Sequence, residues 1–194
     1  MKTFFFFGDS ITLGVNDAPA GGWAGRFAAL ASDAGLPVPP STFYNLGVRK
    51  HSSRQIRERW LGEYRCRINA ASVPYLLFCF GTVDMAAPNG EVVVPLPESL
   101  ENARAILTEA RTEAPVLLLT PPPVQNPEHQ ARIASLCAAY AALCRDMNLP
   151  CLDLQELPPA YVADLGDGLH PGPVGNRLIA ERLLAAPTMR TWMQ

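Results

Sequence analysis

Two widely separated segments hold residue types that together can perform nucleophilic catalysis. Gly-Asp-Ser-Ile spans residues 8–11, and Asp-Gly-Leu-His-Pro spans residues 167–171. A serine hydroxyl is a weak nucleophile that needs an adjacent base, and histidine suits that task near neutral pH. A carboxylate three residues away can hold the imidazole in the right tautomer. The pattern therefore predicts Ser10 as a nucleophile, His170 as its base and Asp167 as the group that orients the base.

Two further segments offer backbone groups for the same chemistry. Asn-Leu-Gly at 45–47 and Gly-Thr-Val-Asp at 81–84 each follow a short apolar run. Backbone N–H groups in tight glycine loops can point at the oxyanion that forms when a hydroxyl attacks a carbonyl. Both segments are therefore expected near Ser10.

The elements that position these segments follow from an alternation of apolar runs and helical patterns. Strands are expected at 4–7, 42–46, 74–80, 116–119 and 151–154. Helices are expected near 22–34, 52–68, 97–113, 128–148 and 172–185, with Pro171 in the first turn of the last one. This alternation predicts βαβ units, a parallel sheet of five buried strands and helices on both faces. Because ligands bind beyond the carboxyl ends of such strands, the four segments are expected at one edge.

Composition favours one domain over residues 1–194. Apolar residues make up 48% of the chain and charged residues 18%, which excludes a disordered chain. The 19 prolines cluster between the periodic segments, for example at 37–40 and 121–123, so each cluster marks a connection. No stretch has the length and composition of an interdomain linker.

Charge and cysteine content exclude several other classes. A formal net charge of -2 gives no electrostatic footprint for nucleic acid, and no apolar run is long enough to span a membrane. The four phenylalanines at 4–7 are too few for a signal-peptide core. Five cysteines without CxxC spacing favour reduced thiols over a disulfide framework or zinc site, which predicts a cytoplasmic location. Nothing in the sequence decides an oligomeric state.

Other catalytic motifs are missing from the sequence. It contains no Gly-x-Ser-x-Gly nucleophile elbow, no GxGxxG fingerprint and no P-loop lysine after the first strand. A nucleotide or dinucleotide cofactor is therefore not expected, and neither is a metal.

With these motifs in place, the chain resembles the GDSL, or SGNH, hydrolases over nearly its whole length, from 8–11 to 167–171. The resemblance implies a flavodoxin-like three-layer α/β/α fold and ester hydrolysis without metal or cofactor. It implies that Ser10 is the nucleophile and that Asp167 and His170 complete the triad. It also implies that Gly47 lends a backbone N–H to the oxyanion hole, beside that of Ser10.

The third family block departs from its usual form, Gly-x-Asn-Asp. Gly81 and Asp84 keep the pattern, but Val83 stands where the family has an asparagine whose side chain donates to the oxyanion. Valine has no donor to offer. Thr82 and Asn89 are the nearest polar residues in sequence that could replace it, and Asp9, Gly81 and Asp84 are expected to support the site loops.

Three other features have a structural and a functional interpretation. The segment 49–67 holds seven of the 16 basic residues against two acidic ones, and it predicts either a solvated helix face or a site for an anionic group. Residues 85–88 either line an acyl pocket or pack as an ordinary loop. His51 and His129 have no ligand-like neighbours in sequence, so both are expected at the surface.

The function that accounts for most of these observations is a serine esterase acting on small-molecule esters, with acetyl or other small acyl groups favoured. Two alternatives stay open. One is transfer of the acyl group to another alcohol by the same triad. The other is a weakly active or non-catalytic ligand-binding module, motivated by Val83.

Overall fold

The centre of the protein is a sheet of five parallel strands. A computed structural model describes residues 1–36 and 41–194, so the proline cluster at 37–40 lies outside the described residues. The strands are β1 (Lys2–Gly8), β2 (Ser41–Gly47), β3 (Val73–Cys79), β4 (Val116–Leu119) and β5 (Cys151–Leu152). Their order is β2-β1-β3-β4-β5, and every neighbouring pair is parallel. This order is that of the flavodoxin-like doubly wound sheet, so the predicted fold class is confirmed.

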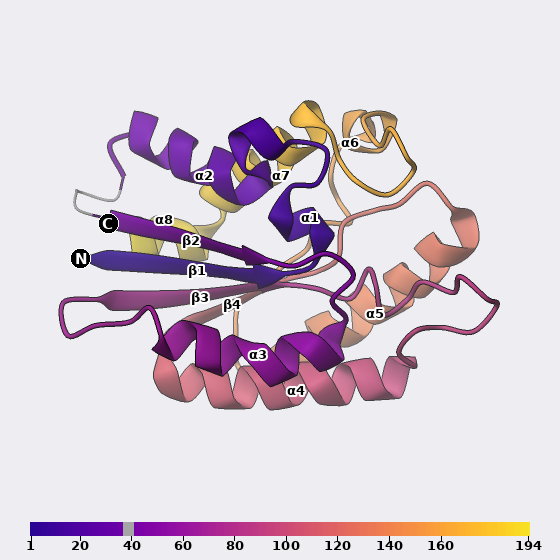
Figure 1. Cartoon of the computed structure of the whole chain (residues 1–194), viewed down its shortest axis with the longest axis horizontal. Helices are drawn as coiled ribbons and strands as arrows, with labels where there is room; N and C mark the ends of the chain where they lie inside the picture. Colours follow the sequence, from indigo (N-terminus) through magenta and orange to yellow (C-terminus); the bar gives the residue numbers. More distant parts are fainter. Residues whose placement is uncertain (37–40) are drawn as a thin grey trace.

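Helices cover both faces of the sheet, which gives three layers (Figure 1). The helices on one face are α2 (Gly22–Asp33), α6 (Pro159–Ala163), α7 (Pro173–Ala185) and α8 (Pro187–Met193). Those on the other face are α3 (Ser53–Arg65), α4 (Leu96–Glu113) and α5 (Pro127–Asp146). The short α1 (Ser10–Leu13) follows β1 directly, and a 3-10 turn spans Ala18–Ala20. None of the helices within residues 1–36 and 41–194 is both long and apolar enough to cross a membrane.

The four phenylalanines of β1 show why the apolar run is continuous. Successive side chains of a strand point to opposite faces. Phe4 and Phe6 therefore pack in the cluster under α2 and α7, whereas Phe5 and Phe7 pack in the cluster under α3. All four are fully buried, and burial of each such side chain contributes roughly 1.5–3 kcal/mol. A strand covered on both faces needs apolar residues at every position.

All five expected strands and all five expected long helices form. The short helices α1, α6 and α8 were not expected, because helices of four to seven residues carry too little periodicity to be recognised. The expectation that Pro171 begins the last helix is wrong. Pro173 is the first residue of α7 and Gly172 its N-cap, while Pro171 forms an isolated bridge with Leu165.

The strand register brings three chain segments to one edge of the sheet. Gly8 at the end of β1 lies opposite Gly47 of β2 on one side and Cys79 of β3 on the other. The loops that follow these strands therefore leave the sheet at the same level. This edge holds the residues expected to do chemistry.

Candidate active site

Ser10 is placed by a sharp turn between β1 and α1. A Cβ atom on Gly8 would lie 2.3 Å from the Cys79 carbonyl oxygen, so only glycine fits where the strand ends. Asp9 is the N-cap of α1, and its Oδ1 accepts a hydrogen bond from the Ile11 N–H at 2.9 Å. Ser10 is the first residue of α1 and stands at the edge of the sheet.

The structure brings Ser10, His170 and Asp167 into one chain of hydrogen bonds. His170 Nε2 lies 2.8 Å from Ser10 Oγ, and His170 Nδ1 lies 2.7 Å from Asp167 Oδ2. The backbone N–H of His170 donates to Asp167 Oδ1 at 2.7 Å, and that of Leu169 donates to the same oxygen at 3.0 Å. The three-residue spacing thus closes a local turn around the carboxylate, as the sequence predicted. In this arrangement the imidazole can take the serine proton at Nε2 while its other nitrogen is held.

Asp167 is kept ionised by its hydrogen bonds. Burial works against the charged form, but the backbone N–H and the side chain of His170 and the N–H of Leu169 outweigh it and lower the pKa of Asp167 to about 2. Its side chain remains 49% exposed, which limits the cost of burying the charge. The Asp167 carboxylate is therefore negative near neutral pH.

Two asparagines that sequence reasoning missed hold the loop of His170. Asn16 Nδ2 donates to the carbonyl oxygen of His170 at 3.1 Å. Asn176 on α7 is fully buried, donates to the Pro171 carbonyl at 2.7 Å and accepts from the Trp23 N–H. The contacts of Asn16 with His170 and of Asn176 with Trp23 cross 153 or more residues of sequence, so no local spacing could have indicated them.

Asp9 lies directly before the nucleophile and is a buried acid. Burial raises its pKa to about 7, the hydrogen bond from Ile11 lowers it, and the charge of Asp84 raises it again. Its Oδ2 has no hydrogen-bond partner among residues 1–36 and 41–194. A carboxyl in this position is favoured in its neutral form, in contrast to Asp167.

Ser10 and His170 line a cavity of about 730 Å³ at the carboxyl edge of the sheet. The remaining lining residues are Arg49, Lys50, Thr82, Val83, Ala86, Ala87, Pro88, Gly90, Val93, Asn126, Glu128, His129, Arg132 and Leu169. Of the segment 85–88, residues 86–88 line this cavity, whereas Met85 is buried in the core. Asn89, an alternative donor named from the sequence, does not line it.

His129 is not the plain surface residue that the sequence indicated. It lies at the start of α5, lines the cavity, and its Nε2 is 2.8 Å from the carbonyl oxygen of Thr82. Burial lowers the pKa of His129, which favours the neutral ring. His51, by contrast, is partly buried outside the cavity, and its Nδ1 accepts from Arg59 Nε at 3.0 Å.

Glycine is required at position 47 for a packing reason, which the family resemblance did not indicate. Its N–H donates to Asn45 Oδ1 at 3.0 Å, and it does not line the cavity. A Cβ atom at this position would lie 2.2 Å from the Leu13 nitrogen, so glycine lets the backbone of α1 pack on β2. The Gly47 N–H is therefore hydrogen-bonded to the side chain of Asn45, near the end of the same strand. Lys50, three residues after Gly47, lines the cavity, and its backbone has a left-handed φ of 62°.

Gly81 and Asp84, which were expected to support the site, lie in the loop after β3. Gly81 has a φ of 119°, a conformation that side chains rarely adopt. Asp84 is fully buried, and its Oδ1 accepts from the Ser53 N–H at 2.8 Å while its Oδ2 accepts from Ser99 Oγ at 2.5 Å. The loop is thereby tied to α3 and α4, and Val83 between these residues faces the cavity without a polar atom in its side chain.

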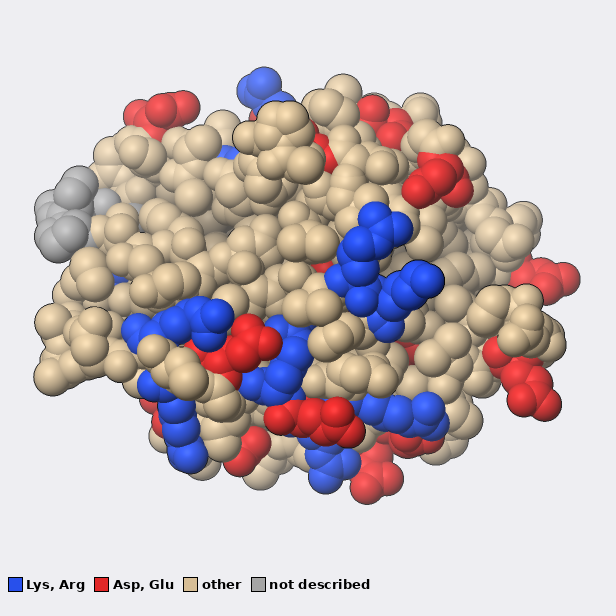
Figure 2. Space-filling view, viewed as in Figure 1, with Lys and Arg blue, Asp and Glu red and all other residues tan. Residues whose placement is uncertain are grey.

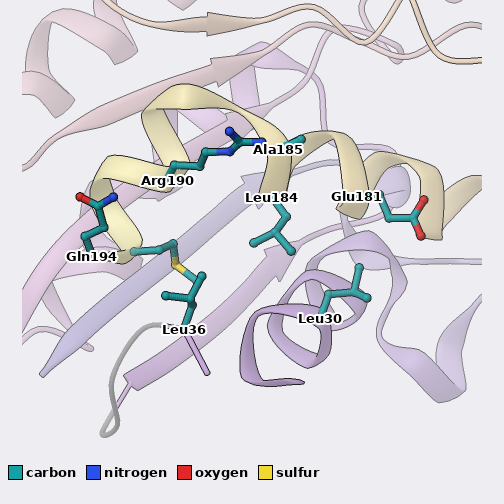
Figure 3. Close-up of a pocket in the computed structure, with 8 residues that line it drawn as sticks. Leu30, Leu36, Glu181, Leu184, Ala185, Arg190 and Gln194 are labelled. Atoms are coloured by element: carbon teal, nitrogen blue, oxygen red, sulfur yellow. The ribbon is translucent and has the colours of Figure 1, made fainter. Parts of the chain in front are cut away.

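A second hollow lies away from the triad. It has a volume of about 510 Å³ and is lined by residues of α2, α7 and α8 together with Leu36 and Gln194 (Figure 3). Leu30, Leu184 and Met193 give it an apolar wall, and it holds none of the predicted catalytic residues. Within the described residues, no group of three or more His, Cys, Asp or Glu side chains is arranged to hold a metal ion. Of the predicted catalytic residues, Ser10 and His170 line the other cavity.

Comparison with known proteins identifies the family of this chain. Residues 6–178 match the GDSL-like Lipase/Acylhydrolase family. The chain belongs to this family. A GDSL esterase/lipase from Arabidopsis thaliana is 26% identical, with 94% of this chain and 84% of the relative covered. The GDSL family relationship places the chain among hydrolases that act on esters.

Solved structures share the fold of this GDSL-family chain. The lipase/acylhydrolase from Enterococcus faecalis superposes with a TM-score of 0.83 at 23% identity, covering 100% of this chain and 98% of the other. An acetylxylan esterase from Geobacillus stearothermophilus superposes with a TM-score of 0.75 at 20% identity, covering 99% and 96%. At these identities the likeness establishes the three-layer fold.

Proposed function

We propose that this protein is a serine esterase that works through a covalent acyl-enzyme. Ser10 Oγ attacks the ester carbonyl while His170 Nε2 takes the hydroxyl proton, and the same nitrogen then protonates the departing alcohol. A water molecule, deprotonated by His170, releases the acid and restores the serine. Asp167 holds the imidazole throughout. The observation that carries the proposal is the continuous chain of hydrogen bonds of 2.8 and 2.7 Å from Ser10 through His170 to Asp167.

The oxyanion is proposed to be held by backbone N–H groups. The N–H of Ser10 donates to no acceptor among the described residues, and neither does that of Lys50. Both residues line the cavity, whereas the N–H of Gly47 is engaged by Asn45. Lys50 is therefore proposed to take the place that the resemblance gave to Gly47. Preorganised donors of this kind stabilise the charge that develops on the carbonyl oxygen.

A side-chain donor in place of the family's asparagine is available at Thr82. This residue is buried and lines the cavity beside Val83. Its hydroxyl makes no hydrogen bond within the described part of the chain, although its carbonyl oxygen accepts from His129. Thr82 is thus a better candidate than Asn89, which lies outside the cavity.

The substrates proposed are esters of small acyl groups. Ala86, Ala87 and Pro88 offer a short apolar wall beside Ser10, within a cavity of about 730 Å³. The similarity to an acetylxylan esterase favours an acetyl group. Val83 favours one competing function, a ligand-binding module with little turnover, since a side-chain donor is missing at that position. Transfer to an acceptor alcohol would use the same residues.

A fluorophosphonate probe tests the proposal directly. Mass spectrometry should find the wild-type protein labelled once, on Ser10, and p-nitrophenyl acetate should be hydrolysed. Ser10→Ala should lose both the label and the hydrolysis, by roughly 10⁴- to 10⁶-fold in kcat.

Ser135→Ala is the matched control, because Ser135 is an exposed serine of α5 that bonds only within its helix. It should behave as wild type. A wild-type protein that hydrolyses no ester and takes no label would identify a binding module instead, and labelling that persists in Ser10→Ala would overturn the assignment of the nucleophile.

A further inference from the structure

The structure divides the basic segment 49–67 into two groups. Five of its seven basic side chains, in α3 or just after its C-terminal end, form hydrogen bonds or salt bridges with other residues of the protein. Their partners are Glu98 for Arg54, Asn102 for Arg57, Glu63 for Arg59, Glu113 for Arg65 and the Glu63 carbonyl for Arg67. Figure 2 shows basic and acidic side chains interleaved over α3. For these five residues the interpretation as a solvated helix face is sufficient.

Arg49 and Lys50 form the second group. Both are exposed, both line the cavity of Ser10, and neither lies within 4.0 Å of a carboxylate among residues 1–36 and 41–194. Figure 2 shows a patch of basic side chains over the loop that joins β2 to α3. Two positive charges therefore stand at the mouth of the candidate active site without a salt bridge to the described protein.

A third cation reaches the same cavity from a different element. Arg132 on α5 donates from Nε to the Met85 carbonyl at 2.8 Å, which fixes the guanidinium, and its other nitrogens make no hydrogen bond within the described residues. The cavity also contains Glu128, while His129 is held in its neutral form by burial. Three cations and one carboxylate give the lining a positive excess, although the whole chain has a net charge of -2.

The backbone of Lys50 adds an independent argument. A left-handed φ of 62° costs free energy for any residue with a Cβ atom, and glycine would avoid that cost. Strain of this kind is maintained by the surrounding structure and is concentrated at active sites and ligand-binding segments. At this position the side chain adds a positive charge to the cavity that contains Ser10.

We propose that the ester cleaved by this protein carries an anionic group, a carboxylate, phosphate or sulfate, which Arg49, Lys50 and Arg132 bind. This inference rests on the proposed function. Arg guanidinium groups form charge-assisted, often bidentate hydrogen bonds with such oxyanions. Uncompensated cations around a cavity also raise the local concentration of anionic substrate.

Two matched pairs of esters test the proposal. One pair places the charge on the acyl side: p-nitrophenyl hydrogen adipate against p-nitrophenyl methyl adipate. The other places it on the alcohol side: 4-acetoxybenzoate against methyl 4-acetoxybenzoate. We expect the anionic member of at least one pair to have a kcat/KM about fivefold or more above its neutral partner at low salt. Raising salt toward 0.5 M should shrink that ratio, because exposed charges are screened.

Variants that each remove one positive charge then identify the residues that bind the anionic group. Arg49→Gln, Lys50→Gln and Arg132→Gln should each lower the ratio of anionic to neutral kcat/KM by roughly two- to fivefold. Arg65→Gln removes a cation of the same segment that is paired with Glu113 outside the cavity, and it should keep the wild-type ratio. Arg49 is exposed, so its variant is expected to fold even if Arg132→Gln does not.

The outcomes separate this inference from the proposed function. Hydrolysis of the neutral esters with no anionic preference in either pair, or ratios that stay at the wild-type value in the Arg49 and Lys50 variants, would overturn the anionic substrate. Absence of hydrolysis for all four esters, together with no labelling of Ser10, would overturn the esterase itself.

Discussion

The two halves of the candidate active site are held together by different means. On one side, the side chains of Ser10, His170 and Asp167 bond one another at 2.7–2.8 Å. On the other side, Val83 offers no polar group, and the proposed oxyanion donors belong to the backbone of Ser10 and of the turn at 48–51. The proton-transfer half thus depends on which side chains are present. The oxyanion half depends on where the chain runs, and single substitutions can test this difference.

The largest effect is expected from Asp167→Asn in the proton-transfer half. The amide keeps an oxygen for the N–H groups of Leu169 and His170 but offers an NH₂ group to Nδ1, which favours the wrong imidazole tautomer. We expect kcat for p-nitrophenyl acetate to fall roughly 10⁴-fold, with little change in Tm. Asp33→Asn, an exposed change on α2, is the control. A loss below about tenfold would show that the carboxylate does not orient the base.

A second expected effect concerns stability through Asp9. Its pKa is about 7 in the folded protein against an ordinary 3.8, so between these values the folded state keeps a proton that the unfolded state has lost. The free energy of unfolding should therefore fall as pH rises from 4 to 7, by up to about 4 kcal/mol from this group. Asp9→Asn should remove that part of the slope in urea unfolding. If the free energy of unfolding changed with pH equally in the wild type and in Asp9→Asn, the result would contradict a neutral, buried Asp9.

In the oxyanion half, Val83→Asn should add a donor. We expect the acylation rate to rise by roughly tenfold if the new amide reaches the oxyanion. An unpaired buried amide would instead cost about 1–3 kcal/mol, so Tm is measured beside the pre-steady-state rate. Val83→Leu, which fills space without donating, should give no gain.

If a well-folded Val83→Asn shows an unchanged rate, another group already fills that position. Thr82→Val should then lower kcat, because it removes the one side-chain hydroxyl beside Val83 in the cavity. Unchanged rates in both variants would leave the oxyanion to the backbone alone.

The smallest effect is expected at Lys50. Lys50→Gly and Lys50→Ala both remove the charge, but only glycine relieves the left-handed backbone. The glycine variant should be more stable than the alanine variant by about 1 kcal/mol in urea unfolding. At Glu58, an exposed position inside α3, the order should reverse, since glycine is the poorer helix former. Equal stability of the two Lys50 variants would mean that the turn does not require this conformation.

The sequence by itself determined the sheet and indicated the residues of the proposed proton-transfer half. Apolar runs and helical periods are local signals, and a sheet covered on both faces makes them strong, as the fully buried run at 4–7 illustrates. The roles proposed for Ser10, His170 and Asp167 rest on side-chain types that the sequence states directly. Their position after predicted strand ends placed them at one edge before any distance was known.

Only the tertiary structure decided the rest of the cavity. Every residue except proline has the same backbone N–H, so the path of the chain alone directs the N–H of Gly47 to Asn45 and leaves that of Lys50 without an acceptor in the described protein. Likewise, His129 and Arg132 enter the cavity from α5, far in sequence from Ser10, Lys50 and Val83. Residues that meet only through tertiary packing show no regular spacing in the sequence. Their shared site can therefore be recognised only once the fold is known.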